Sequence, residues 1–258
     1  PVIAKIEKPE AMINLDEILK SFDGILIARG DLGVEMPLAR LPIIQKKIIK
    51  KCRAKQKPVI IATQMLESMI SSSIPTRAEV NDVASAVYEQ VDAVMLSGET
   101  AVGKYPLETI QIMKDIILNI ENEYIDYQFQ RRSDKSINSR DAIGEAVKAI
   151  SNNLEIQAIV VMSESGETSK IVSSFKPKAN IFSLCPHIDS CNRMSLFWGV
   201  TPIHTREYLS TDEMLVHSEK LLLDKKYLKK GQTFVMTAGV PVGITGSTNM
   251  LKIHKIKK

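Results

Sequence analysis

Two charged side chains near the start of the sequence, Lys5 and Glu7, stand two residues apart in an apolar run that is typical of a β-strand. Positions i and i+2 of a strand face the same side, so the ammonium and the carboxylate point the same way. Asp31 closely follows the next apolar run. Because parallel strands in α/β proteins place their sites at the carboxyl ends, the three charges are expected to converge. Two carboxylates with substrate oxygens suit Mg²⁺ or Mn²⁺, so we predict a divalent-metal site at Glu7 and Asp31.

The same residues also allow a purely structural interpretation. Lys5 and Glu7 could form an ion pair inside a barrel, and Asp31 could cap a short helix. The residue types and their spacing do not decide between this interpretation and the metal site.

Two further residues fall at the same predicted rim. Gly30 lets the backbone approach a ligand closely, and the turn that it begins would present free N–H groups to an anion. Thr63 ends the third apolar run, where its hydroxyl could bind a substrate carboxylate or relay a proton. Its structural alternative is a hydrogen bond to a neighbouring carbonyl. Several strands that each deliver a polar group to one rim favour a functional site.

The elements that must position these residues follow a repeated pattern of a short apolar run and an amphipathic stretch, as βα units do. The runs are apolar throughout, which predicts parallel strands that are buried on both faces. The expected strands are Val2 to Glu7, Gly24 to Arg29, Pro58 to Thr63 and Ala93 to Ser97. The expected helices are Leu15 to Ser21, Leu41 to Ala54, Glu79 to Glu89 and Leu107 to Tyr124.

A polar stretch without periodicity, residues 127–140, predicts a linker between a first domain, residues 1–126, and a second, residues 141–258. The second domain is again expected to be α/β. Its expected strands are Ala158 to Met162, Ile181 to Leu184, Val200 to His204, Thr233 to Ala238 and Asn249 to His254. Four helices are expected: one that starts at Ser139 or Asp141, one that starts near Glu167, one that ends at Phe197 and one that spans Thr211 to Leu228.

Composition bounds the class of protein. The 258 residues carry a net charge of +4, and 44% of them are hydrophobic, as in a globular protein of two domains. We expect no membrane span, and we read the basic C-terminal tail as a solvated strand edge rather than a nucleic-acid site. Three cysteines without metal-ligand spacing fit a reducing cytoplasm. The chain begins at Pro1 inside an apolar run, which we interpret as a cut.

Five segments of the first domain together resemble one family. They are Ala4 to Pro9, Ile27 to Glu35, Ile61 to Met69, Pro75 to Glu79 and Met95 to Ala101. In order and spacing they are similar to the fifth to eighth barrel strands of pyruvate kinase. The resemblance covers the whole chain and is looser after about residue 120. It implies an α/β fold: half of a TIM (β/α)8 barrel followed by a smaller α/β C-terminal regulatory domain with a mostly parallel sheet.

The resemblance also implies roles for individual residues. Lys5 and Thr63 would be catalytic, Lys5 by stabilising the phosphoryl group in flight and Thr63 near the protonation step. Glu7 and Asp31 would bind Mg²⁺ or Mn²⁺. Arg29, Gly30, Asp31 and Thr63 would contact phosphoenolpyruvate. A further residue, Arg77, begins a segment that looks like the subunit interface of the family's homotetramer.

In the second domain, the segment from Ser163 to Ser169 joins a strand to a helix and resembles the family's allosteric phosphate loop. The residues that would contact a sugar-phosphate or nucleotide effector are Ser163, Ser165, Gly166, Thr168 and Ser169. The Gly-rich turn 243–248 resembles the loop that closes over the effector. The structural alternative is a serine-rich turn that caps a helix.

The function implied is the glycolytic transfer of a phosphoryl group from phosphoenolpyruvate to ADP, with K⁺ bound by the half of the barrel that this chain lacks. Four strands leave half of the site missing, so we expect the isolated chain to be inactive. Two other interpretations remain: a binding module for phosphate effectors without catalysis, and a metal-dependent aldolase or lyase barrel.

Overall fold

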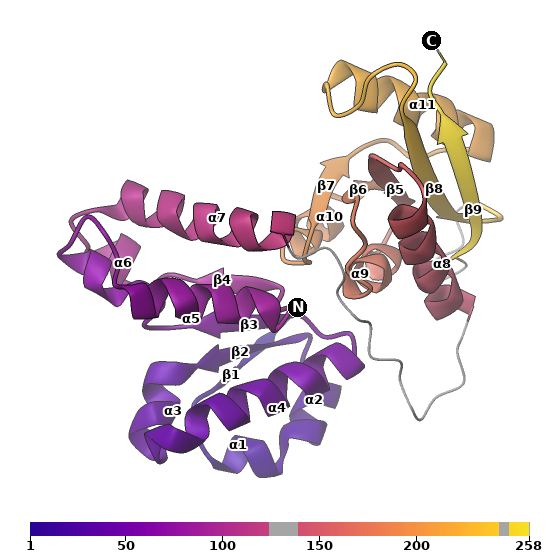
Figure 1. The fold of residues 1–258 in the computed structure, drawn as a ribbon. Coiled ribbons are helices and arrows are strands. Elements are labelled where there is room, and N and C mark those ends of the chain that lie inside the picture. The colour runs from indigo at the N-terminus through magenta and orange to yellow at the C-terminus, as the bar shows by residue number, and fades with distance from the viewer. Residues whose placement is uncertain (124–138, 243–247, 258) are drawn as a thin grey trace. The chain divides into compact units, whose positions relative to one another are not determined.

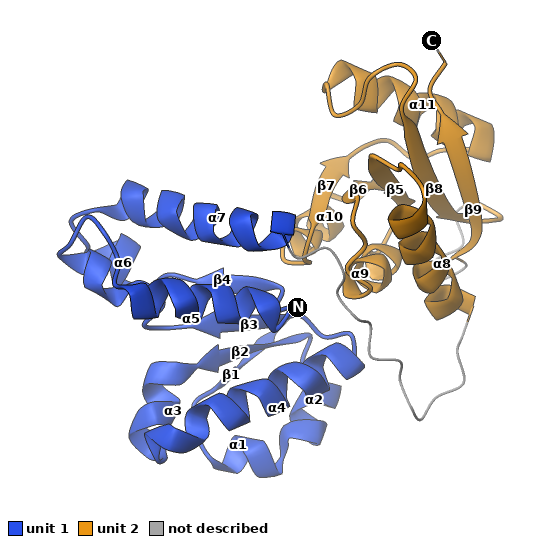
Figure 2. Ribbon diagram, in the orientation of Figure 1, with its two compact units in different colours: residues 1–128 blue, residues 129–258 orange. Residues whose placement is uncertain are grey.

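The computed structural model describes residues 1–123, 139–242 and 248–257. The chain divides into two compact units, residues 1–128 and 129–258, which Figure 2 colours separately. Each unit has its own sheet and its own hydrophobic core, and each is described by itself.

The first unit is built on a four-stranded parallel sheet, in the order β1-β2-β3-β4 (Figure 1). Its strands are β1 (Ile3–Ile6), β2 (Gly24–Ala28), β3 (Val59–Ala62) and β4 (Ala93–Met95). The parallel arrangement expected from the apolar runs is therefore confirmed. The last residues of β2, β3 and β4 lie opposite one another in the register, because Ala28 pairs with Ala62 and Ala62 pairs with Met95. The residues that follow β2, β3 and β4 therefore lie at the same end of the sheet, at the carboxyl ends of its strands.

Helices connect these strands. They are α1 (Glu10–Ile13), α2 (Leu15–Ser21), α3 (Arg29–Glu35), α4 (Leu41–Ala54), α5 (Arg77–Tyr88), α6 (Gly98–Ala101) and α7 (Pro106–Glu123), with the short 3-10 turns η1 (Leu38–Arg40) and η2 (Glu67–Ile70). The start of α5 lies two residues before the expected Glu79, because Thr76 caps the helix. The Thr76 hydroxyl accepts from the Glu79 N–H, and the Glu79 carboxylate accepts from the Thr76 N–H, which is a capping box.

The core of the first unit lies between the sheet and these helices. Ile25, Ile27 and Ile61 of the strands are fully buried with Leu19 of α2 and Ile48 of α4. Burial of such side chains contributes about 1.5 to 3 kcal/mol each relative to exposure. Packing against the helices thus fixes the strands in place, and the polar residues are found at the carboxyl ends of the strands.

The second unit has a five-stranded sheet in the order β7-β6-β5-β8-β9, parallel except for β9. The elements are α8 (Ser139–Asn153), β5 (Ala158–Met162), α9 (Glu167–Ser174), β6 (Asn180–Cys185), α10 (Ile188–Met194), β7 (Val200–His204), α11 (Thr211–Asp224), β8 (Thr233–Gly239) and β9 (Thr248–Lys255). The expected mostly parallel α/β sheet is confirmed. The first strand, β5, sits in its middle, as a doubly wound fold requires.

Alternation along β5 separates two hydrophobic clusters. Val160 and Met162 pack with Phe234 and Leu222 on the face that α11 covers. Ile159 and Val161 pack into a different cluster with Val147 of α8 and Val172 of α9. Because neighbouring strand residues face opposite sides, one buried strand supports helices on both faces of the sheet.

The helix α11 ends at Asp224, four residues before the expected Leu228. Lys226 adopts a left-handed backbone with φ of 58°. The N–H groups of Tyr227 and Leu228 both donate to the Leu222 carbonyl, at 2.9 and 3.1 Å. The helix α11 therefore ends in a left-handed turn at Lys226, a position that glycine more often occupies.

Residues 127–138 of the expected linker and residues 243–247 of the expected Gly-rich turn lie outside the described residues. In the part of the chain that is described, no helix combines the length and the apolar character needed to cross a membrane.

Candidate functional site

The first predicted site residues, Lys5 and Glu7, meet at the carboxyl end of β1. The Lys5 ammonium contacts the Glu7 carboxylate and also donates to Asp31 Oδ2 at 3.0 Å. All three side chains are more than a third exposed, so the cluster is not a buried ion pair. The hydrogen bonds to Glu7 and then to Asp31 raise the pKa of Lys5 above its ordinary 10.5. Lys5 is therefore a full positive charge at neutral pH.

Asp31 lies in the first turn of α3, directly after β2. The N-terminal residue before this helix is Ala28, and no side chain caps it, so Asp31 does not act as a cap. The structural alternative of a capping Asp31 is thus wrong. An acidic residue in a first turn is nonetheless stabilised by the helix dipole.

Gly30, beside Asp31 in α3, links the end of β2 to the residue after β3 by a hydrogen bond. Its N–H donates to Thr63 Oγ1 at 2.8 Å. A methyl group added at Gly30 would meet only Thr63, at 3.4 and 3.7 Å, which is near ordinary contact. Packing within this chain therefore does not demand a glycine here.

Thr63 occupies a left-handed backbone, with φ of 73°, and the next residue, Gln64, has φ of 55°. This conformation is rare for a β-branched residue and costs about 1 to 3 kcal/mol. The Thr63 hydroxyl donates to the Ala62 carbonyl at 2.6 Å and accepts from Gly30. The expected structural role is thus present, and the strained turn fixes the hydroxyl at the rim.

Arg29 holds this turn in place. Its guanidinium donates to the carbonyls of Thr63 and Gln64, at 2.8 and 3.3 Å, and to Asp82 of α5 at 2.7 Å. Its side chain is 10% exposed. Its Nε is buried without a hydrogen-bond partner among the described residues. Arg29 therefore supports the rim from behind.

Two glutamates that the sequence did not single out brace the segment after β3. Glu99 of α6 is 2% exposed, and its carboxylate accepts from the N–H groups of Leu66 and Ser97, at 3.2 and 2.7 Å. Glu79 accepts from the N–H and hydroxyl of Ser68, at 2.7 and 2.6 Å. Burial raises the pKa of Glu79, but the hydrogen bonds from Ser68 and Thr76 outweigh it and hold that pKa below its ordinary 4.5.

Asp82 and Glu99 were missed because they act on Arg29 and Leu66, which are 53 and 33 residues away in the sequence. Glu79 and Glu99 do lie inside the segments Pro75 to Glu79 and Met95 to Ala101 that carry the resemblance. That was the available signal for them. Arg77, the predicted interface residue, is the first residue of α5 and is exposed.

A divalent metal fits the chemistry of this rim. Glu7 and Asp31 both contact one positive charge, the Lys5 ammonium, so one cation between them is within reach of both. Carboxylate oxygens are the hard ligands that Mg²⁺ and Mn²⁺ prefer. No group of three or more potential ligands from His, Cys, Asp or Glu occurs in the described ranges. Two protein ligands would leave the other positions to substrate oxygens and water.

The predicted phosphate loop joins β5 to α9. The Ser163 hydroxyl accepts from the Gly166 N–H at 3.0 Å, and Gly166 is left-handed with φ of 87°. Ser165 is exposed. The Thr168 hydroxyl bonds that of Thr248 at 2.6 Å. The N-cap residue of α9 is Gly166, which has no side chain, but the Ser163 hydroxyl accepts from its N–H, so the structural alternative of a serine-rich turn at the start of the helix is supported.

Ser169 differs from the other residues of this loop. It is fully buried, and its hydroxyl bonds the Ser183 hydroxyl of β6 at 2.6 Å. Ser169 therefore supports α9 from inside the unit. Ser163, Gly166 and Thr168 are buried as well, and Ser165 is exposed.

Together, the two units define an α/β protein of the parallel-sheet class, with charged groups at the carboxyl ends of barrel-type strands. Comparison with known proteins makes the class specific. The family profile "Pyruvate kinase, barrel domain" matches residues 1–110, and "Pyruvate kinase, alpha/beta domain" matches residues 141–254. The chain belongs to the pyruvate kinase family.

Individual relatives agree. The chain is 46% identical over 257 residues to a pyruvate kinase of Geobacillus stearothermophilus, covering 99% of this chain and 44% of that protein. It is 42% identical over 258 residues to a pyruvate kinase of Clostridium acetobutylicum, covering 99% of this chain and 54% of that protein. A crystal structure of a pyruvate kinase from Cryptosporidium parvum superimposes with a TM-score of 0.91 at 32% identity, covering 98% of this chain and 51% of that one. The chain thus spans about half the length of these relatives.

Proposed function

We propose that the protein to which these residues belong transfers the phosphoryl group of phosphoenolpyruvate to ADP, giving pyruvate and ATP. The observation that carries the proposal is the contact of one ammonium, that of Lys5, with two carboxylates, those of Glu7 and Asp31, at the strand ends. Phosphoryl transfer depends on positioning and charge neutralisation more than on covalent help, and this cluster supplies both.

In this proposal Glu7 and Asp31 hold the Mg²⁺ or Mn²⁺ ion, which supplies positive charge to the phosphoryl and substrate oxygens when it is bound. Lys5 would direct its ammonium from the carboxylates toward the phosphoryl group during its transfer. K⁺, as the family requires it, would be bound by residues outside this chain. With the charge of the two carboxylates offset by the ion, Lys5 would be free to contact the substrate.

The backbone around Gly30 and Asp31 and the hydroxyl of Thr63 would bind phosphoenolpyruvate. A substrate group could approach Gly30 closely, because the nearest atoms to a methyl group placed there are those of Thr63, at 3.4 and 3.7 Å. After the phosphoryl group leaves, the enolate must take a proton at its methylene carbon. The Thr63 hydroxyl, fixed by Ala62 and Gly30, would orient a water that delivers it. Arg29, predicted as a substrate contact, would act through the turn that it holds.

The assembly and regulation of the protein follow the same proposal. Arg77, exposed at the start of α5, would lie at a subunit interface of a homotetramer. The loop around Ser163, Ser165, Gly166 and Thr168 would bind the phosphate of a sugar-phosphate or nucleotide effector, with Ser169 supporting it. The three cysteines are free thiols, which fits a cytoplasmic protein.

We further propose that a polypeptide of only these 258 residues has no kinase activity. A closed barrel of this class takes eight strands, whereas the sheet here has four, and β1 and β4 each have one hydrogen-bonded neighbour. The purified chain should form no pyruvate above the blank in a coupled assay with phosphoenolpyruvate, ADP, Mg²⁺ and K⁺. Turnover well above the blank would contradict this proposal.

The metal site can be tested in the isolated chain without activity. Binding of Mn²⁺, followed by electron paramagnetic resonance, should weaken about tenfold or more in Asp31→Asn, since a coordinating charge is lost. Glu35→Gln is the matched control, because Glu35 pairs with Lys8 at 2.8 Å on the same helix as Asp31. Equal Mn²⁺ affinity of Asp31→Asn and Glu35→Gln would exclude Asp31 as a ligand.

A further inference from the structure

A groove in the second unit lies along β7, an edge strand of the sheet, and its lining includes no residue of the predicted phosphate loop. It encloses about 560 Å³ between β7 and α11. This volume is within the range of small-molecule sites in proteins, about 300 to 1,000 Å³. The residues around it come from one continuous segment, Thr201 to Arg206, and from the helix and its C-terminal turn.

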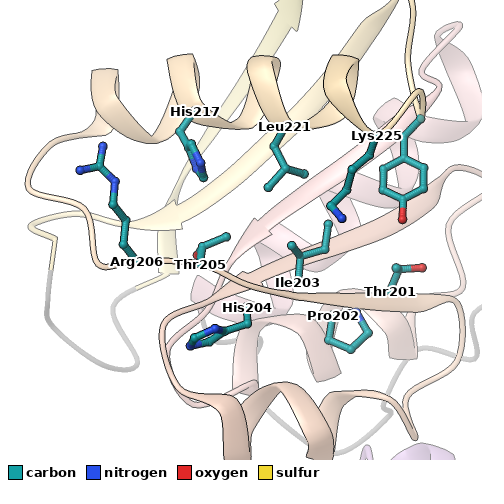
Figure 3. A pocket seen from close by; sticks show the side chains of 10 residues that line it. Thr201, Pro202, Ile203, His204, Thr205, Arg206, His217, Leu221 and Lys225 are labelled. Atoms are coloured by element: carbon teal, nitrogen blue, oxygen red, sulfur yellow. The ribbon is translucent and has the colours of Figure 1, made fainter.

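The helix side of the groove is one stripe of α11. His217, Leu221 and Lys225 are spaced four residues apart, so they share a face, and Figure 3 shows them pointing toward β7. On the strand, Thr201 and Thr205 lie on the side toward the helix in Figure 3, and alternation places them there together. The groove therefore has hydroxyl groups on one wall and a basic and apolar stripe on the other.

The charge of the lining is one-sided. It includes Arg206, Lys225, His204 and His217 but no Asp or Glu. Arg206 is paired with Glu213 at 2.5 Å. Within the described ranges, no ion pair engages the Lys225 ammonium. An unpaired ammonium with further basic groups around it favours an anionic ligand.

A second observation comes from the strand wall. The Thr205 side-chain oxygen is buried, with Thr205 9% exposed, and among the described residues it makes no well-aligned hydrogen bond, although it interacts with the Tyr208 hydroxyl. The neighbouring Tyr208 hydroxyl is bonded to His217 Nδ1 at 2.5 Å. A buried hydroxyl whose hydrogen bonding is incomplete is unfavourable, so a ligand or water that bonds it would stabilise the unit.

The groove does not suit another β-strand. The Thr205 N–H donates to the Cys185 carbonyl of β6, so alternation along a parallel pair turns Pro202 toward the open edge. Proline has no N–H to donate, and it is a residue by which proteins block pairing at sheet edges. A small ligand fits this edge better than an added strand does.

We propose that the groove between β7 and α11 binds a small organic anion. Its phosphate or carboxylate group would contact the Lys225 ammonium, and the Thr205 hydroxyl would donate to it, whereas Arg206, paired with Glu213, lies at the opposite end of the groove from Lys225 in Figure 3. Its apolar part would lie against Leu221, Ile203 and the Tyr227 ring, which stacks on Phe182 with centroids 4.4 Å apart. The site shares no residue with the proposed catalytic rim or with the loop at Ser163.

The four histidines of the chain provide the test. Selectively labelled histidine would be followed by NMR while phenyl phosphate or benzoate is titrated into the 258-residue protein. The proposal predicts a saturable shift of the His217 signal with at least one probe, and the probe that binds identifies the head group. His254, paired with Glu219, and His187, before α10 near the loop at Ser163, should move much less.

Two variants make the test specific. Lys225→Gln and Thr205→Val should each weaken binding, the first by about tenfold because a charge-assisted contact is lost. Lys220→Gln, on the same helix but outside the groove, is the matched control and should bind like the original protein. The proposal is overturned if neither probe shifts His217 saturably, if His187 responds instead, or if Lys225→Gln and Lys220→Gln bind equally.

Discussion

The Arg29 guanidinium donates to the Asp82 carboxylate at 2.7 Å and to the Thr63 carbonyl at 2.8 Å, so one side chain joins α5 to the strained turn at the rim. Replacing Asp82 by Asn should lower the free energy of unfolding by about 1 to 3 kcal/mol, because a nearly buried guanidinium loses its countercharge. Urea denaturation of the first unit measures this loss.

A matched exposed pair calibrates that measurement. Lys20 and Glu17 are 2.7 Å apart but 64% and 72% exposed, so Lys20→Gln should change the free energy of unfolding much less than Asp82→Asn does. Equal effects of the Asp82 and Lys20 changes would show that the Arg29 contact does not hold the turn.

Lys5 lies between the two proposed metal ligands and competes with a cation for them. In the isolated chain, Lys5→Met should therefore bind Mn²⁺ more tightly than the original protein does, while the whole enzyme with the same change should lose about a thousandfold in kcat. Electron paramagnetic resonance measures the first effect and a coupled assay the second. Weaker Mn²⁺ binding by Lys5→Met would contradict the placement of Lys5 between Glu7 and Asp31.

Thr63 is expected to act through its hydroxyl. In the whole enzyme, Thr63→Val should lower kcat by about a hundredfold or more, because the proton-delivery step loses its orienting group. Thr63→Ser keeps the hydroxyl and should restore most of the rate. Should the serine variant be as slow as the valine variant, the hydroxyl would have no role in the reaction, and the γ-methyl group would matter only for the turn.

Glu79 predicts a pH dependence of stability. Its pKa in the folded protein is below the ordinary 4.5, so its contribution is fully present above pH 4.5 and is lost as the pH falls through the lowered value. The stability difference between the original protein and Glu79→Gln should thus shrink as the pH falls below 4.5. Glu67→Gln, at an exposed position in η2, is the control for the change of side chain. A constant difference for Glu79→Gln would refute this assignment.

Gly166 combines two restrictions that a control can separate. A methyl group there would meet Met194 Cγ at 2.9 Å on a backbone of φ 87°, whereas at Gly231, with φ of 86°, it would meet nothing within 4 Å. Gly231→Ala should cost about 1 kcal/mol, the backbone penalty alone. Gly166→Ala should cost measurably more in thermal unfolding. Equal losses would mean that Met194 moves freely aside.

The strands could be predicted from the sequence because buried parallel strands are apolar throughout, and Gly24–Ala28 and Ala158–Met162 are such runs. The convergence of Lys5, Glu7 and Asp31 could also be predicted, since i, i+2 spacing and strand ends are local information. What could not be predicted depends on long-range geometry. The left-handed turn at Thr63 carries no glycine, and it persists only because Arg29 and Glu99 hold it from other elements.

The central claim is tested most directly on the native polypeptide that contains these residues, by measuring its intact mass together with its rate of pyruvate formation from phosphoenolpyruvate and ADP. The account predicts a mass near twice the 28.7 kDa of this chain, with pyruvate formation that requires Mg²⁺ or Mn²⁺ and is lost in Lys5→Met. A polypeptide of that size that forms no pyruvate with these ions present, or that keeps its full rate without Lys5, would contradict it.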